Sequence, residues 1–192
     1  MKRTLFCTVL LLSSASALAG ATSYNQRGDH AYGAGVIDHG DGCTWTQVTV
    51  WYGDGMSMGG GKPTTYTQST FWYDTYDDCA GTYIWTDGTT TEATYSSNSS
   101  GATLAGTAAL TEWFTGDSLG EISFSVTWTA SGTSSKGISN WSYNYPGGMY
   151  RYRSVGTTTD ATFGGTANGY TLGSGWGSYG TSTTGSLSVY TH

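Results

Sequence analysis

Two acidic loops that each end in a cysteine form the first pattern in this sequence that could do chemistry. The loops span residues 38–43 and 74–79, and their last residues are Cys43 and Cys79. The third cysteine, Cys7, lies in a segment with the features of an export leader, so the remaining pair is even. An even pair in an exported protein predicts a disulfide. It would close a loop of about 37 residues and contribute roughly 4 kcal/mol in the chain-entropy model.

Such a disulfide would bring the carboxylates of the two loops together. Like charges held close together are unfavourable unless a cation lies among them, and hard carboxylate oxygens favour Ca2+. The spacing of an EF-hand loop is absent, so solvated turns are the competing interpretation. The candidate calcium ligands are Asp38, Asp41, Asp74, Asp77 and Asp78.

A second set of residues suits carbohydrate binding. Segments 44–52, 65–73 and 82–86 alternate with a period of two, which predicts strands. Val48, Phe71 and Ile84 mark the expected inner face, so the opposite face carries aromatic rings beside amides and a carboxylate. Aromatic rings pack on the C–H groups of a sugar, and the polar groups can hydrogen-bond its hydroxyls. The candidate ligand-binding residues are Trp45, Gln47, Trp51, Tyr66, Gln68, Trp72, Tyr83, Trp85 and Glu92.

Two other interpretations of these rings stay open. Loops, or the Gly/Ser/Thr-rich segment 174–185, could cover the aromatic face and turn it into a second core. Alternatively, the assignment of inner and outer faces could be reversed. A large exposed aromatic patch is the informative case, because monomeric proteins rarely leave one uncovered without a function.

Two hairpins are expected. Asp87-Gly88 is a strong type I′ turn signal, and a turn there would place Tyr83 opposite Glu92. The second turn, at residues 146–149, would pair Tyr145 with Tyr150 and Tyr143 with Tyr152. The aromatic residues flanking this second turn would then share one face, which we expect to be buried in the core.

The residue pattern over the whole chain predicts an all-β protein. Gly, Ser and Thr are scattered throughout and no helical apolar stripe persists, whereas about ten short strand-like segments recur between Gly-rich turns. Segment 121–130 alternates apolar Ile122, Phe124, Val126 and Trp128 with Ser and Thr, as a half-buried strand does. We therefore expect one antiparallel β-sandwich of the jelly-roll type over residues 20–192, with segment 174–185 as a loop.

The ends and the charge of the chain bear on its location and partners. Lys2 and Arg3, the apolar run 5–12 and the small residues 17–19 predict a signal peptide over residues 1–19 and a secreted protein, extracellular or periplasmic in a Gram-negative host. Residues 20–192 hold five of the seven Lys and Arg but all 13 Asp and Glu, for a formal net charge of −8. This acidity argues against nucleic acid as a partner, and no apolar run is long enough to span a membrane.

Two resemblances add to this interpretation. In size and in its Gly, Ser, Thr, Trp and Tyr content, the chain resembles the small jelly-roll xylanases; a glycosidase would need two carboxylates, for which Glu112 and Glu121 are the candidates. The strands that carry the catalytic glutamates of that family are not recognisable, so no residue role is transferred. Residues 125–166, with SVTWTASG from Ser125, YPGG from Tyr145, RSVG from Arg153 and ATFGGT from Ala161, resemble uncharacterised exported bacterial β-proteins. That resemblance implies no activity.

The sequence thus predicts a monomeric extracellular binding module for a glycan or a cell-surface polysaccharide, without catalytic residues. A jelly-roll glycoside hydrolase and a structural cell-surface or matrix protein are the alternatives. Calcium is the one cofactor that the residues suggest.

Overall fold

The computed structural model describes residues 21–59, 62–90 and 92–190, and the predicted leader lies outside them. The described chain is built of antiparallel strands. The strands are β1 (Ala21–Asp38), β2 (Thr44–Gly59), β3 (Lys62–Asp77), β4 (Thr82–Ile84), β5 (Thr86–Thr90), β6 (Thr94–Asn98), β7 (Gly101–Glu112), β8 (Ser118–Tyr145), β9 (Gly148–Ala167) and β10 (Tyr170–Tyr190). The predicted all-β antiparallel class is confirmed.

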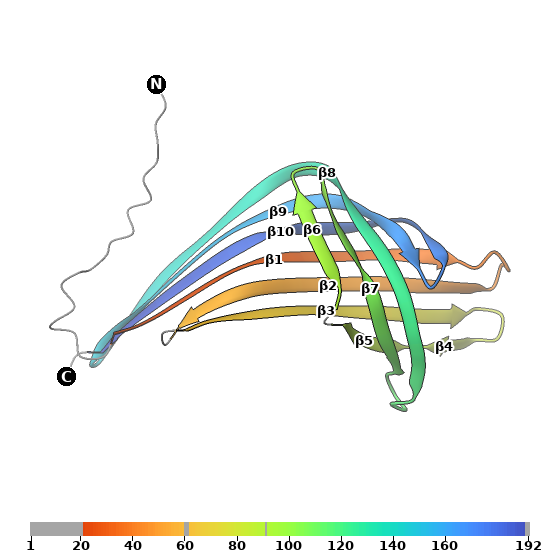
Figure 1. The fold of residues 1–192 in the computed structure, drawn as a ribbon, viewed down its shortest axis with the longest axis horizontal. Helices are drawn as coiled ribbons and strands as arrows, with labels where there is room; N and C mark the ends of the chain where they lie inside the picture. Colours follow the sequence, from red (N-terminus) through yellow and green to blue (C-terminus); the bar gives the residue numbers. More distant parts are fainter. Residues whose placement is uncertain (1–20, 60–61, 91, 191–192) are drawn as a thin grey trace, which may run out of the picture.

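All ten strands belong to one sheet that closes on itself (Figure 1). Its order is β2-β1-β10-β9-β8-β7-β5-β3-β4, and an additional pairing of β2 with β3 joins the two ends. β6 pairs with β7 outside this path, and β4 extends the edge at β3. Inner faces of strands that are not neighbours therefore pack against each other across one shared core.

Counted over the described residues, the core holds six aromatic and 14 aliphatic buried residues. Phe71 on β3 stacks on Phe124 on β8 with ring centroids 4.6 Å apart. Trp128, also on β8, is buried, and its Nε1 donates a hydrogen bond of 2.7 Å to the backbone oxygen of Tyr32 on β1. In segment 121–130 the predicted alternation is confirmed, with the apolar residues buried and the intervening Ser and Thr exposed.

Glycine makes room for these rings on neighbouring strands. A Cβ atom at Gly177 would lie 2.7 Å from Cδ1 of Trp128, and one at Gly33 would overlap the ring of Phe163. Because only glycine lets a ring lie this close to the backbone, the high glycine content and the aromatic core depend on each other.

Six strands continue beyond the closed part as an open sheet, which we call the arm (Figure 1). The rest of the described chain is called the body. In the arm the sheet order is β8-β9-β10-β1-β2-β3, and its two outer strands are each paired on one side. The arm comprises residues 21–28, 55–59, 62–66, 131–145, 148–157 and 182–190.

Several local predictions were wrong. Asp87-Gly88 is not a turn: it lies inside β5, where Gly88 is opposite Phe71 of β3 and Leu110 of β7. Tertiary pairing on both sides overrides the turn preference, and Tyr83 does not face Glu92. Ile84, expected inside, is 45% exposed, because β4 is a short edge strand beyond the closure.

The loop expected at 174–185 is instead part of β10. Its glycines allow close strand approach, since a Cβ at Gly175 or Gly180 would collide with the backbone oxygen of Ala34 or Thr157. The second hairpin forms with a different register: Tyr143 pairs with Tyr150 and Tyr145 with Gly148. Gly147, at φ 86°, allows the tighter turn.

Candidate functional site

Outward-facing aromatic residues lie on four neighbouring strands of the body, and we call them the aromatic belt. They are Trp176 on β10, Tyr32 on β1, Trp51 on β2 and Trp72 on β3. The register places Tyr32 opposite Trp51, while Trp176 and Trp72 share the next row through Ala34 and Thr49. Two adjacent rows of one face therefore carry rings on four consecutive strands.

The alternation of β2 and β3 explains why these rings point outward. Val48, Val50 and Phe71 are completely buried on the inner face, so Trp51 and Trp72 take the opposite parity. Trp51 is opposite Thr70 and Trp72 is opposite Thr49, which makes the two indoles diagonal neighbours across the β2–β3 ladder. The sheet thus has aromatic rings on both faces.

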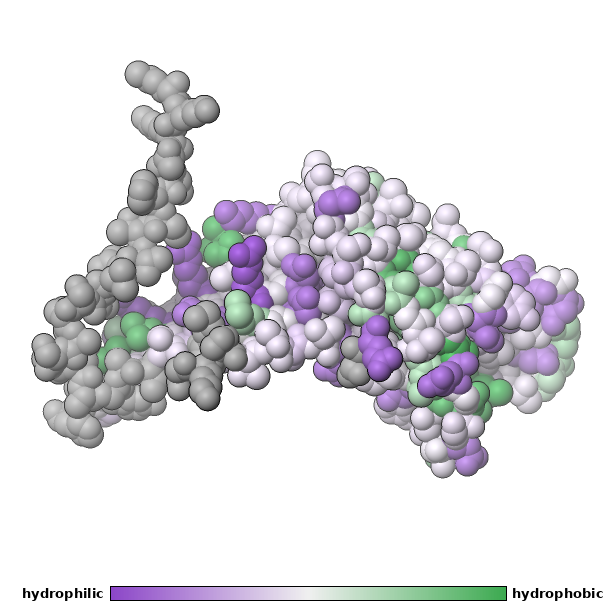
Figure 2. Space-filling view, in the orientation of Figure 1, coloured by the Kyte–Doolittle hydropathy of each residue, from purple (hydrophilic) through white to green (hydrophobic). Residues whose placement is uncertain are grey.

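The belt is open to solvent. Trp176 is 64% exposed and Trp51 is 36% exposed, whereas Tyr32 and Trp72 are half-buried. The rings of Tyr32 and Trp176 are 5.2 Å apart and inclined by 45°. Much of the visible surface around the strands has intermediate hydropathy, as Thr, Ser and Gly give (Figure 2).

Glycine also fixes the position of the Trp51 ring. A Cβ atom at Gly53 would lie 2.8 Å from Cη2 and 2.9 Å from Cζ2 of Trp51, so the six-membered ring lies over Gly53. Farther along the same face, Tyr66 lies over Gly55 in the same way and accepts a hydrogen bond from Nε2 of Gln26. Backbone support on one side of the Trp51 ring leaves its other side for a ligand.

Polar groups flank the belt on β2 and β3. Nε2 of Gln47 donates to Oγ1 of Thr49 over 3.4 Å. Asp74, opposite Gln47, accepts a 2.8 Å hydrogen bond from the backbone N–H of Thr86, and burial raises the pKa of its carboxyl. Gln68 is exposed on the same outward face, between the belt and Tyr66.

The remaining predicted ligand-binding residues lie elsewhere. Trp45 stacks on Tyr76 at 4.1 Å near the disulfide, and its Nε1 donates to Oδ2 of Asp78 over 3.2 Å. Tyr83 and Trp85 form a separate cluster with Phe114, with ring centroids 5.6 and 5.5 Å apart. Glu92 is exposed between β5 and β6, and its backbone N–H donates to Oγ1 of Thr90 over 3.3 Å.

Two belt residues, Tyr32 and Trp176, were missed by the sequence interpretation. Trp176 was assigned to a loop, and Tyr32 precedes the first segment that was interpreted as a strand. The sequence feature that could have identified Trp176 is the period of two along residues 176–179. In the structure Gly177 and Tyr179 are buried, and Trp176 and Ser178 lie on the opposite face.

The disulfide between Cys43 and Cys79 is confirmed, with Cα atoms 5.4 Å apart. The acidic side chains around it bind the backbone of their own turns. Oδ1 of Asp41 accepts from the N–H groups of Cys43 and Thr44 at 2.9 and 2.6 Å, which lowers its pKa to about 2. Asp38 accepts likewise from Gly40.

The second acidic loop has the same chemistry. Oδ1 of Asp77 accepts from the N–H groups of Cys79 and Ala80 at 3.0 and 2.9 Å. Asp74 accepts its hydrogen bond from the N–H of Thr86, and Asp78 accepts one from Nε1 of Trp45. Among residues 21–59, 62–90 and 92–190, no group of three or more His, Cys, Asp or Glu side chains is arranged to hold a metal ion.

A polar cluster at the border of body and arm was not anticipated. Tyr52 stacks on Tyr95 at 4.1 Å and donates a 2.9 Å hydrogen bond to Oδ2 of Asp54. Asp54 also accepts from the N–H of Asp29, whose carboxyl pKa is raised by burial and by the Asp54 charge. Within the described residues the buried hydroxyl of Tyr179 has no hydrogen-bond partner, and burial raises the pKa of Tyr95 to about 12.

The two candidate glutamates lie near the junction of β7 and β8. Oε2 of Glu112 accepts a 2.6 Å hydrogen bond from the N–H of Thr115, and hydrogen bonding to Thr115 lowers its pKa. Glu121 is exposed on β8, opposite Ala109. Asp87, Glu112 and Trp113 line one shallow pocket of about 350 Å³, and Glu121 does not contribute to it.

The aromatic face of the second hairpin was expected in the core and is instead exposed. Trp141 is 51% and Tyr143 61% exposed. Trp141 lies 5.1 and 5.4 Å from the rings of Tyr150 and Tyr152, so the rings cover one another rather than a core. The reason is the register, which puts Tyr150 and Tyr152 on the outward face of β9, opposite to buried Ala161 and Phe163, together with their partners on β8.

Comparisons with models of protein families, with curated proteins and with solved structures each find no significant match to this chain. The part of the chain that the structure describes contains no helix with the length and hydropathy needed to cross a membrane.

Proposed function

We propose that this protein is a secreted, monomeric binding module that holds a carbohydrate chain on its aromatic belt. The observation that carries the proposal is the set of rings on four consecutive strands of one outward face, two of them well exposed. Neighbouring strands lie about 4.8 Å apart, so four strands present an extended surface about 14 Å across. This surface suits a chain of sugar rings.

The chemistry of the belt supports a carbohydrate rather than an apolar ligand. Indole and phenol rings pack against sugar C–H groups, while Thr70, Gln47 and Gln68 offer hydroxyl and amide groups for its hydroxyls. The support of Trp51 by Gly53 also favours binding, because a ring that is already positioned loses little freedom when a ligand arrives.

The experiment is a glycan array on residues 20–192, followed by calorimetry of the best ligand. Trp176→Ala and Trp51→Ala should each weaken binding at least about tenfold, or about 1.4 kcal/mol. The matched control is Trp113→Ala, since Trp113 is 60% exposed, close to the 64% of Trp176, but directly follows β7, a strand outside the belt. Unchanged affinity in both belt variants would refute the proposal, and so would a folded protein that binds no glycan.

The open edges of the arm favour a second candidate, a structural surface protein that associates with itself. Residues 134–145 of β8 pair with β9 alone, and residues 62–66 of β3 pair with β2 alone. Unpaired strand edges are templates for pairing with another chain. Sedimentation at rising concentration tests this candidate: a single monomeric species at high concentration would reject it.

A further inference from the structure

The charges of this protein are segregated between body and arm. All five Lys and Arg that follow the leader lie in arm strands, at positions 27, 62, 136, 151 and 153. All 13 Asp and Glu lie in the body, with Asp29 and Asp54 at its border. The arm is therefore a cationic element attached to an anionic body.

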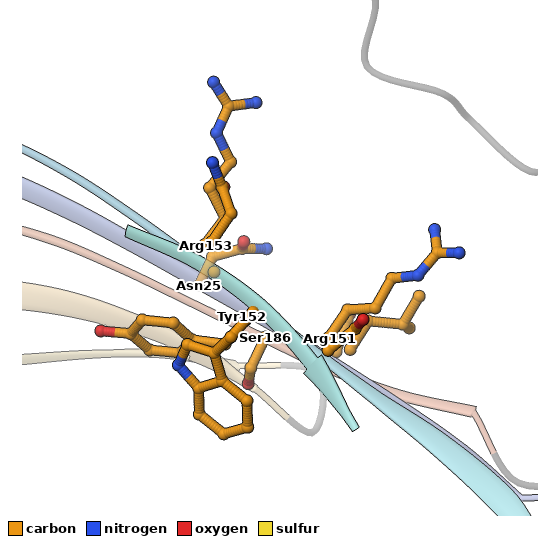
Figure 3. Close-up of a pocket in the computed structure, with 11 residues that line it drawn as sticks. Asn25, Arg151, Tyr152, Arg153 and Ser186 are labelled. Carbon is orange, nitrogen blue, oxygen red and sulfur yellow. The ribbon is translucent and has the colours of Figure 1, made fainter. Parts of the chain in front are cut away.

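Two of these cations share one face of β9. Arg151 and Arg153 alternate with Tyr150 and Tyr152, so the guanidinium groups project from one side of the sheet and the rings from the other. Figure 3 shows Arg151, Arg153 and Asn25 on one side of the strands, and Tyr152 and Ser186 on the opposite side. The two arginines thus lie apart from the exposed rings of the arm.

These arginines line a groove of about 690 Å³, whose lining also includes Trp141, Tyr152 and Ser186. The register puts Arg153 in a row with Asn140, Gly185 and Asn25, and Arg151 in a row with Ser142, Leu187 and Ser23. Gly185 leaves the groove open, because a Cβ there would lie 2.9 Å from Oδ1 of Asn25. Within the described ranges, neither guanidinium has an ion-pair or hydrogen-bond partner.

We propose that this groove binds the carboxylate or sulfate groups of an acidic polysaccharide. Guanidinium groups bind carboxylate and sulfate-like anions through paired N–H donors, and these two are free to do so. The Asn and Ser side chains in the same two rows supply short polar groups for the hydroxyls between the acidic groups. The site is distinct from the aromatic belt in its residues and in the face of the sheet that it occupies.

The arrangement favours an acidic polysaccharide over a single-stranded nucleic acid. Proteins that bind single strands combine basic side chains with aromatic rings on which the bases stack. Here the ring of Tyr152 lies on the opposite side of the strands from the two guanidinium groups (Figure 3). Trp141 is paired with Tyr152 and shares its face, so one strand could not stack on these rings and contact both arginines. The negative body would repel a long polyanion of either kind, which confines its binding to the arm.

The test measures binding of polygalacturonate and heparin, with uncharged dextran as the reference polymer, at low and high salt. The groove variant is Arg151→Gln with Arg153→Gln. The matched control is Arg27→Gln with Lys136→Gln, which removes the same charge from exposed arm positions that do not line the groove. All four side chains are exposed, and thermal melting will verify that both variants fold.

We expect the wild-type protein to bind at least one acidic polymer and not dextran, with affinity falling as salt rises. The groove variant should lose at least tenfold in affinity and the control less than threefold. Trp176→Ala should retain its affinity for the acidic polymer. The belt proposal and the groove proposal can therefore be refuted independently of each other.

Several results would overturn the inference. Equal losses in both double variants would mean diffuse charge attraction, and equal binding of dextran would mean that acidic groups are not recognised. Tighter binding of a single-stranded DNA than of both acidic polymers would assign the groove to nucleic acid. Loss of salt-sensitive self-association in the groove variant, without any polymer binding, would assign it to the acidic body of a second copy.

Discussion

The body and the arm are made of the same strands and the same alternating residues, yet they differ in almost every physical property. In the body the sheet closes, so one face is buried and holds Phe71, Trp128 and Phe163. In the arm the same β8 and β9 continue without an opposing layer, and both of their faces meet solvent. The comparison teaches that alternation specifies which side chains share a face, whereas closure of the sheet decides whether that face is buried.

The sharpest way to test this comparison is to remove one tryptophan from each region. Trp128→Ala should lower the free energy of unfolding by about 3–5 kcal/mol, because it leaves a cavity in the core and removes the hydrogen bond to Tyr32. Trp141→Ala, in the arm, should lower it by less than about 1 kcal/mol, the value of its ring contacts. Urea denaturation measures both, and similar losses would show that the arm has a core of its own.

The disulfide is expected to have the next largest effect. It joins the β1–β2 loop to the β3–β4 loop at the end of the body. The double variant Cys43→Ser with Cys79→Ser should therefore lose about 2–4 kcal/mol of stability, because the unfolded chain gains freedom. Thermal melting of the variant beside the oxidised and reduced wild-type protein provides the measurement. A variant as stable as the oxidised protein would contradict this expectation.

Two glycine substitutions, one in the body and one in the arm, test the same difference with a smaller expected change in stability. Gly177→Ala should destabilise the protein by about 1–3 kcal/mol, because the new Cβ would lie 2.6 Å from the Tyr32 backbone oxygen and 2.7 Å from the Trp128 ring. Gly137→Ala, in the arm, is the control, since nothing lies within 4 Å of its Cβ position. Denaturant midpoints should fall for the first variant and stay level or rise for the second; the reverse order would refute the packing argument.

The smallest expected effect concerns His30, which lies next to the border between the two regions. Burial lowers the pKa of His30, and the Asp29 charge opposes this shift. A histidine with a lowered pKa contributes stability above its ordinary pKa of 6.5 that is lost as the pH falls through the lower folded value. His30→Gln should therefore lose less stability than the wild type between pH 7 and pH 5. Melting curves across that range would test it, and identical slopes would count against it.

Sequence patterns predicted the parts of this fold that depend on local alternation. The period of two assigned Val48, Val50 and Trp128 to the inner face, and cysteine parity identified the disulfide. Both follow from residue type and spacing alone, because a strand always alternates its faces.

The remaining features depend on contacts between distant segments. Asp87-Gly88 has the sequence of a turn, but pairing with β3 and β7 holds it straight. Trp141 was assigned to the core from its own hairpin, whereas pairing with β9 puts it on the outward face, the opposite face from Trp128. The aromatic belt needed β10 beside β1, a pairing between the two ends of the described chain that no local pattern in the sequence indicates.

The sheet of the body closes through β5, which has short pairings with both of its neighbours. β5 reaches β3 only at Ser69, Thr70 and Phe71, and reaches β7 over residues 86–89, whereas β9 and β10 pair over almost their full lengths. Structural units held by few backbone hydrogen bonds open most often in native proteins. The amide protons of β5 should consequently exchange with deuterated solvent well before those of β9, and transient opening at that seam is the route by which solvent first reaches Phe71.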